Sequence, residues 1–142
     1  MAFWLVKSEP DAFSWQQQVA HGTEPWTGVR NAQAAAQLKA MRRGELAFFY
    51  HSNVGKEIVG VVEVVREAYP DPTEDVPEGK APRWVCTDMR AVGPMPEPVT
   101  LAAIKAEPRL DGIPLVRQSR LSVMPISAEH WGVLCAMGGW RG

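Results

Sequence analysis

The chain has 142 residues, a net charge of −1 and a hydrophobic fraction of 46%, values that are typical of one globular domain with a substantial core. This charge balance excludes nucleic-acid binding through a broad basic surface, because neutralising phosphates requires many clustered Lys and Arg side chains. It leaves room for a small basic patch or for recognition of a base. The two cysteines lack CxxC spacing, which favours buried thiols over a disulfide framework or a zinc site.

The amino terminus does not have the pattern of a signal peptide, because Lys7 and Glu9 follow only a short apolar run. No segment approaches the ~20 apolar residues of a membrane span. The predicted location is therefore the cytoplasm, or the nucleus in a eukaryote. We expect no cofactor, no metal and no membrane partner.

The first elements are a short strand and a capped helix. Residues Phe3–Val6 are apolar and predict a buried strand, which ends at the polar residues Lys7–Glu9 before Pro10. Ser14 and Gln17 have the spacing of a capping box, which predicts a short helix directly after them. Polar groups therefore follow immediately on the first strand.

A tryptophan loop precedes the second helix. Residues 23–30 have neither a helical nor a strand period, and they place Trp26 in an ordered loop. Judged alone, Trp26 is more simply a lid on the core than one wall of a binding slot, since tryptophan is usually buried. Asn31 is a good N-cap for a helix that ends at Gly44. The apolar stripe of that helix consists of Ala34, Ala35, Leu38 and Met41.

Two buried strands joined by a hairpin follow. Leu46–Tyr50 and Ile58–Val65 are short apolar runs rich in aromatic or β-branched residues. His51–Lys56 between them is a polar connection with a glycine. Strands that are apolar on both faces predict a sheet that is covered on both sides, or that is curled into a barrel.

The remaining elements complete an α+β fold. Residues Arg83–Val92 alternate as a third main strand, and the prolines of residues 94–98 predict an extended connector. Short helices are expected after Thr100 and after Ser127, with a last strand over Leu121–Met124 between them. The chain therefore predicts a strongly bent sheet or a small barrel with helices against it.

No catalytic constellation stands out. The chain lacks G-x-S-x-G, HExxH, P-loop and GxGxxG patterns in the structural context that they need. His51 and Ser52 are adjacent, and neighbouring side chains on a strand point to opposite faces. An enzyme would need another pairing of nucleophile and base.

A binding site fits the residues better. Polar groups lie at predicted strand ends in Lys7–Glu9, Tyr50–Ser52 and Arg120–Ser122. The Trp26 loop also leads into the helix that Asn31 caps. An aromatic wall beside a few fixed donors and acceptors suits a planar heterocycle, because stacking contributes ~1–3 kcal/mol per base and edge hydrogen bonds discriminate between bases. The plainer alternative is that these serines and the asparagine only cap strand and helix ends.

Several segments together carry a resemblance to a known family. They are F-W-L-V-K-S-E-P from Phe3, W-T-G-V-R-N-A-Q-A from Trp26, F-F-Y-H-S-N from Phe48, I-V-G-V-V-E-V-V-R-E-A-Y-P-D-P-T from Ile58, P-R-W from Pro82 and R-L-S-V-x-P from Arg120. In this order they resemble the EVE domain family, whose relatives include the thymocyte nuclear protein family. The resemblance implies a single α+β domain over residues 1–142, a PUA-like mixed β pseudo-barrel flanked by short helices and related to the YTH and PUA modules.

The resemblance also implies a pocket for a modified nucleobase. Trp26 would be the stacking wall, with Thr27 beside it. Ser8 and Glu9 would face the base edge, and Tyr50–Ser52 would form the floor. The full predicted nucleobase pocket consists of Lys7, Ser8, Glu9, Trp26, Thr27, Arg30, Asn31, Tyr50, His51, Ser52, Trp84, Arg120, Leu121 and Ser122.

The leading hypothesis is a non-catalytic module that binds a modified cytosine or adenine of DNA or RNA, as a flipped or single-stranded base. One alternative is an enzyme that acts on a modified base or nucleotide through His51 and Glu9. Another is a protein-interaction module. Ala32 departs from the family, which often has Tyr there, so a stacking or hydroxyl contact from that position is missing.

Overall fold

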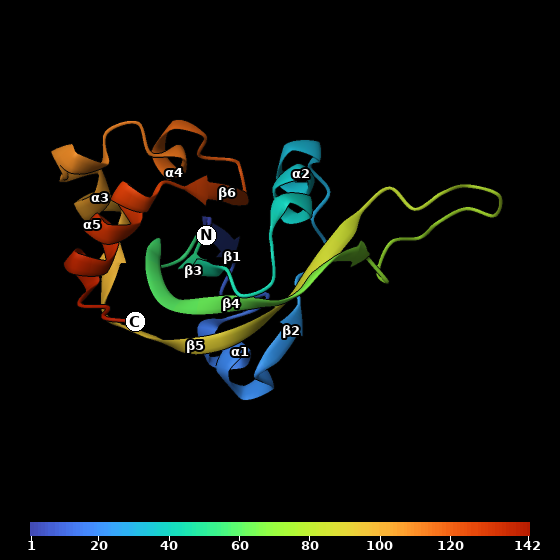
Figure 1. Ribbon diagram of the computed structural model, residues 1–142, viewed down its shortest axis with the longest axis horizontal. Coiled ribbons are helices and arrows are strands. Elements are labelled where there is room, and N and C mark those ends of the chain that lie inside the picture. Colours follow the sequence, from blue (N-terminus) through green and yellow to red (C-terminus); the bar gives the residue numbers. More distant parts are fainter.

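One bent, mixed sheet organises the molecule, shown here as a computed structural model of residues 1–142 (Figure 1). Its elements are β1 (Phe3–Ser8), α1 (Trp15–His21), β2 (Thr23–Pro25), α2 (Ala32–Ala40), β3 (Leu46–His51), β4 (Glu57–Pro70), β5 (Val85–Thr100), α3 (Leu101–Ala106), a 3-10 turn η1 (Pro108–Leu110), α4 (Pro114–Arg117), β6 (Val123–Ile126) and α5 (Ala128–Gly138). The strand order is β2-β5-β4-β3-β1-β6, and only the β1–β3 pair is parallel. The α+β class and the mixed sheet with short helices are confirmed. Because β2 and β6 do not pair with each other, the sheet stays open and does not close into a barrel.

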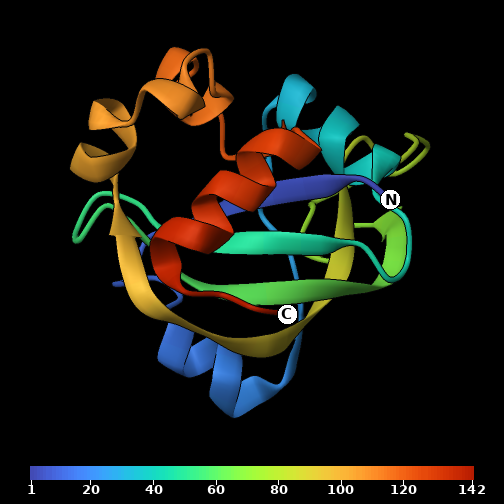
Figure 2. The ribbon, with the colours of Figure 1, turned by 60° about the vertical axis from the view of Figure 1, so that its left-hand side comes forward.

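Both faces of the sheet are covered, as Figure 2 shows for α5 on one side and α1 on the other. In β3, Phe48 stacks on Trp131 of α5 with ring centroids 3.9 Å apart. Its neighbour Phe49 contacts Trp15 and Trp26 on the opposite face, at 5.3 and 5.6 Å. The unbroken apolar run of β3 therefore reflects burial on both faces, as the sequence predicts.

Four helices begin at side-chain caps that the sequence identifies. Each cap oxygen accepts a hydrogen bond from the backbone N–H three residues further on, which satisfies one free amide of the first turn. The caps are Ser14, Asn31, Thr100 and Ser127. By contrast, β2 and α4 are not predicted, because elements this short hold too little periodicity.

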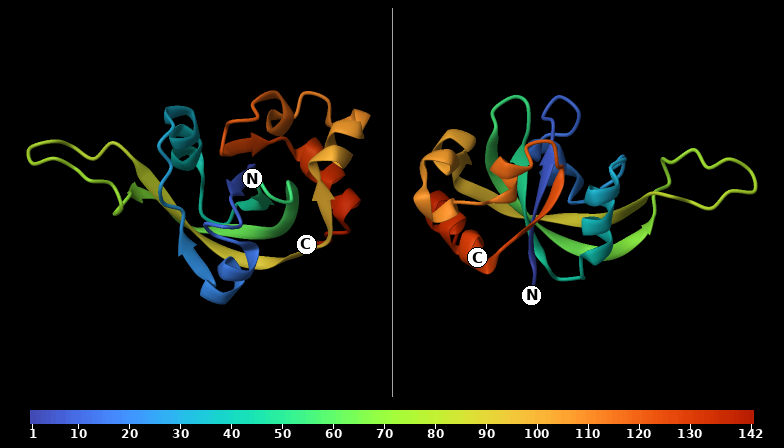
Figure 3. Two further views of the ribbon diagram at one scale, coloured as in Figure 1. Left: turned by 180° about the vertical axis from the view of Figure 1, so that it is seen from behind. Right: turned by 90° about the horizontal axis from the view of Figure 1, so that it is seen from above.

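β4 and β5 are longer than the sequence predicts and form an arm that projects from the body (Figures 1 and 3). β4 continues past Val65 to Pro70, where it pairs with Val85 at the start of β5. Residues 71–84 connect the two strands at the tip of the arm. The arm therefore places this connection far from the helices on the other side of the molecule.

The predicted proline connector is instead the second half of β5. Residues 94–98 lie within the strand, which runs on to Thr100. β5 pairs with β2 only at residues 88–90. Beyond Arg90 the outer edge of β5 has no partner strand, so prolines are tolerated there although they cannot donate a backbone hydrogen bond. The prediction that this strand ends near Val92 is wrong for that reason.

Gly60→Ala is expected to destabilise the protein. A Cβ at Gly60 of β4 would lie 2.5 Å from ring atoms of Trp15, the buried indole that holds α1 on the sheet. Overpacking of this kind costs about 1–3 kcal/mol of unfolding free energy. Urea unfolding measures the difference.

Gly132→Ala is the matched control, since a Cβ at this position in α5 meets nothing within 4 Å. Alanine should there stabilise the helix by roughly 0.5–1 kcal/mol. A Gly60→Ala protein as stable as the wild type would contradict the close packing of Trp15 on β4.

Candidate functional site

A cleft of about 450 Å³ opens at the carboxyl end of β1. The loop between β1 and α1 forms one side. β2 and the loop that leads to α2 form the other side, and Ser122, just before β6, completes the lining. The cleft is thus built from segments far apart in the sequence that the sheet brings together.

Two aromatic side chains form the wall of the cleft. The rings of Trp26 and Phe13 lie 6.4 Å apart between centroids, with their planes at 81°. Trp26 is only 7% exposed, because its indole also packs edge-on against Phe49. Phe13 is half-buried, and its carbonyl accepts a hydrogen bond from the Ser8 hydroxyl at 2.5 Å. Trp26 therefore belongs to the core and to the cleft wall, and Phe13 offers the more accessible ring.

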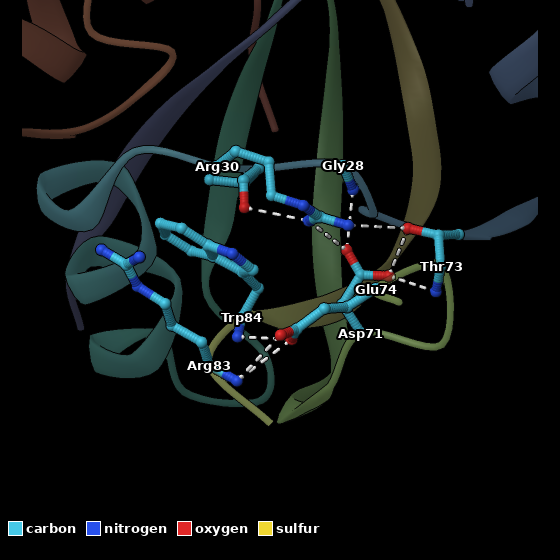
Figure 4. Close-up of polar contacts among 8 residues, drawn as sticks. Gly28, Arg30, Asp71, Thr73, Glu74, Arg83 and Trp84 are labelled. Atoms are coloured by element: carbon cyan, nitrogen blue, oxygen red, sulfur yellow. Dashed lines mark hydrogen bonds and ion pairs between the residues drawn. The ribbon is translucent and has the colours of Figure 1, made fainter. Parts of the chain in front are cut away.

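The Trp26 loop is fixed by Asp71, directly after β4 (Figure 4). Oδ2 of this fully buried carboxylate accepts hydrogen bonds from the Gly28 amide at 2.8 Å and from the Arg30 guanidinium at 3.0 Å. Oδ1 accepts from the amide and the hydroxyl of Thr73, at 2.7 and 2.6 Å. Burial alone would raise the pKa of Asp71, but these hydrogen bonds outweigh it and lower the pKa to about 2.

Trp84 lies outside the cleft lining, at the end of the connection between β4 and β5. The Glu74 carboxylate accepts hydrogen bonds from the backbone amides of Arg83 and Trp84, at 3.1 and 2.8 Å. The Trp84 indole lies between two guanidinium groups, with the Arg83 and Arg30 carbons 4.5 and 6.0 Å from its centroid (Figure 4). Trp84 therefore packs beside Arg30 and does not line the cleft, although the resemblance counts it among the residues of the nucleobase pocket.

Charged groups of both signs border the cleft. Lys7 Nζ donates to the Ser119 carbonyl at 2.8 Å, and burial lowers the pKa of this ammonium group. Glu24 Oε1 lies 2.7 Å from His21 Nδ1. Glu9 is exposed at the rim. A ligand in the cleft would meet a donor and acceptors beside the aromatic wall.

The structure gathers part of the predicted nucleobase pocket. Lys7, Ser8, Glu9, Trp26, Thr27, Arg30 and Ser122 line the cleft. Asn31, Arg120 and Leu121 line a neighbouring hollow of about 320 Å³. Ligand contact by either group stays a prediction.

The expected floor of Tyr50, His51 and Ser52 is not part of the cleft lining. Tyr50 is only 3% exposed, and burial raises the pKa of its phenol. His51 Nε2 accepts a hydrogen bond from the Trp15 amide at 3.0 Å, and burial lowers the pKa of the imidazole. The Ser52 amide donates to the Ser8 carbonyl at 3.0 Å. The His51 imidazole therefore ties α1 to β3, and the Ser52 amide ties the end of β3 to β1, next to the cleft.

Sequence reasoning misses several lining residues, of which Phe13 is the most informative. An aromatic residue directly before the Ser14 cap has a fixed position at the helix entrance, so a signal for it was available. Glu24 and Pro25 belong to β2, which is too short to predict. The missed residues are Ala12, Phe13, Glu24, Pro25, Gly28 and Val29.

No three His, Cys, Asp or Glu side chains lie close enough together to hold a metal ion. Likewise, no helix has the length and apolar character needed to span a membrane. The two cysteines, Cys86 and Cys135, are both free thiols.

Comparison with known proteins identifies the family. Residues 2–137 match the model of the EVE domain. The chain belongs to the EVE domain family. Thymocyte nuclear protein 1 of Homo sapiens is 34% identical over an alignment of 163 residues. The alignment covers 94% of this chain and 72% of the human protein. The solved structure of Rpa0253 from Rhodopseudomonas palustris is 57% identical, with a TM-score of 0.90 over 100% of this chain and 96% of that one.

Two solved structures of proteins similar to this EVE domain contain nucleic acid. The human THYN1 protein, in complex with 5-methylcytosine containing DNA, is 31% identical with a TM-score of 0.90 over 100% of both chains. The YTH domain of Zygosaccharomyces rouxii MRB1 protein, in complex with N6-methyladenosine RNA, is 14% identical with a TM-score of 0.57, over 99% of this chain and 86% of that one. The second likeness shows a shared fold alone. The resemblance to the EVE domain and thymocyte nuclear protein families is confirmed.

Asp71→Asn is expected to destabilise the protein and to loosen the Trp26 loop. The amide lacks the charge that the Arg30 guanidinium binds, and its NH₂ group cannot accept from the surrounding donors. We expect a loss of about 1–3 kcal/mol of unfolding free energy at neutral pH, measured in urea. Asp75→Asn, exposed in the same connection, is the control and should change little. Equal stability of the two variants would contradict the role of Asp71.

The same carboxylate predicts a loss of stability in acid. The pKa of Asp71 is about 2 in the folded protein against an ordinary value of 3.8, so the folded state holds this proton less tightly. Its contribution of ~2 kcal/mol is complete above about pH 4 and is lost as the pH falls toward 2. The stability of Asp71→Asn should therefore depend less steeply on pH across this window than that of the wild type. Parallel pH profiles of the two proteins would refute this assignment.

Proposed function

We propose that this EVE domain binds nucleic acid by accepting one modified nucleobase, flipped or single-stranded, into the cleft at the end of β1. The observation that carries the proposal is a similarity over the whole length of this chain. It is the similarity to the solved structure of the human THYN1 protein in complex with 5-methylcytosine containing DNA. A modified cytosine is therefore the first ligand class to test, and a modified adenine is the second.

The chemistry of the cleft supports a planar, polar-edged ligand. Its volume of about 450 Å³ is in the range of ordinary small-molecule sites. The rings of Trp26 and Phe13 supply contact area for a base, and stacking of this kind contributes ~1–3 kcal/mol. Lys7 can donate to a base edge and Glu9 can accept from one, which is how related bases are discriminated.

Binding without catalysis fits the geometry better than the enzyme alternative. That alternative needs His51 as a base in concert with Glu9. Nε2 of His51 is already occupied by the Trp15 amide, and its side chain is not among the cleft residues. We therefore infer a non-enzymatic reader. Turnover of a modified nucleotide that disappears in His51→Ala would contradict this inference.

A single-stranded oligonucleotide with one 5-methylcytosine should shift the amide NMR resonances of the cleft residues, and an unmodified strand should shift them less. Phe13→Ala should weaken binding of the modified strand about tenfold, because one stacking surface worth ~1–2 kcal/mol is lost. Trp26→Phe preserves an apolar wall in the core and should weaken binding by a smaller factor. Titration followed by NMR measures both affinities and reports whether each variant is folded.

Val19→Ala is the control for these variants, because Val19 is exposed on α1 and does not line the cleft. Equal affinity for modified and unmodified strands would count against selective reading. Unchanged binding in both Phe13→Ala and Trp26→Phe would rule out the cleft as the site.

A further inference from the structure

A second hollow, which we call the polar trough, lies beside the cleft. It is lined by Asn31, Gln33, Gln118, Ser119, Arg120 and Leu121 and has a volume of about 320 Å³. One side is the start of α2, and the other is the segment between α4 and β6. All of its lining residues except Leu121 are polar or charged, whereas the cleft has an aromatic wall. The two hollows therefore suit chemically different parts of a ligand.

The polar trough adjoins the cleft. The chain passes from one lining to the other between residues 30 and 31, and again between residues 121 and 122. A hydrogen bond also joins them, since Lys7 Nζ in the cleft donates to the Ser119 carbonyl in the trough at 2.8 Å. A ligand seated in the cleft can extend into the trough along the protein surface.

The trough has a fixed shape and one free positive charge. Gln33 Nε2 donates to Gln118 Oε1 at 2.8 Å, which ties its two sides together. Arg120 is exposed and takes part in none of the ion pairs of the protein. Arg30, in the cleft, is by contrast neutralised by the buried Asp71. Arg120 is therefore the one guanidinium group in the lining of the trough, and it is available to an anion.

We propose that the polar trough binds the phosphodiester backbone next to the base held in the cleft, with Arg120 as a phosphate ligand. This inference rests on the proposed function and adds which surface, and which charged residue, hold the strand beside the bound base. A guanidinium group matches phosphate oxygens in geometry and charge, and neutral side-chain donors such as Asn31 add contacts that fix the register of the strand. One such contact also explains how a chain of net charge −1 can hold a polyanion without a broad basic surface.

Arg120→Gln tests the inference, with Arg43→Gln as the matched control. Arg43 is exposed just beyond the other end of α2 and forms no ion pair, so both variants lose one free positive charge. The probes are 5-methyl-2′-deoxycytidine and a single-stranded DNA oligonucleotide with one 5-methylcytosine. Arg120→Gln should lower affinity for the oligonucleotide about tenfold and reduce the slope of log K against log salt by about 1. Affinity for the nucleoside should not change.

A second measurement locates the phosphate. Methylphosphonate groups, placed one at a time in the oligonucleotide, each remove one backbone charge. At one position next to the modified base this change should weaken binding to the wild type and leave binding to Arg120→Gln unaffected, as expected for two halves of one interaction.

The outcomes separate the two proposals. If Phe13→Ala loses binding of both probes while Arg120→Gln behaves like Arg43→Gln, the trough inference is overturned and the cleft proposal stands. If the wild type shows no preference for the modified probes, the proposed function fails and the trough inference fails with it. A loss confined to the oligonucleotide in Arg120→Gln supports the inference.

Discussion

The binding face depends on one buried carboxylate, that of Asp71. A charge removed from water costs several kcal/mol unless other donors replace its hydration. Here the donors are the Gly28 amide, the Arg30 guanidinium, and the amide and hydroxyl of Thr73. They come from two separate segments, so the carboxylate is satisfied only when both are in place. The loop that carries Trp26 is thereby locked to the longest hairpin of the sheet.

The cleft is built mostly from loops, and each loop is tied to a strand. The Trp26 amide donates to the Thr87 carbonyl of β5 at 2.7 Å, and the Ser8 hydroxyl of β1 holds the Phe13 carbonyl. The sheet beneath them is packed on both of its faces by aromatic side chains, as Phe48 and Phe49 show on β3. A site on anchored loops loses little conformational entropy on binding, which favours selectivity between similar ligands.

The parts of the fold that depend on neighbours in the sequence could be predicted. The caps at Ser14 and Asn31 and the two-sided strand at Leu46–Tyr50 are of this kind, since short-range hydrogen bonds and apolar runs define them. The extent of β5 could not be predicted, because prolines are tolerated there only where the next strand is missing. The residues of the site divide in the same way, into those set by their neighbours in the sequence and those set by distant partners. Lys7–Glu9 and the Trp26 loop reach the cleft, whereas the positions of His51 and Trp84 depend on long-range partners that no local pattern reveals.

Glu74 has a consequence for how this fold can vary. Its carboxylate bridges to the amides of Arg83 and Trp84, so it fastens together the two ends of residues 75–82. Residues 75–82 are not part of the cleft lining. Insertions or deletions within residues 75–82 can therefore change the length of the arm without moving the residues that line the cleft.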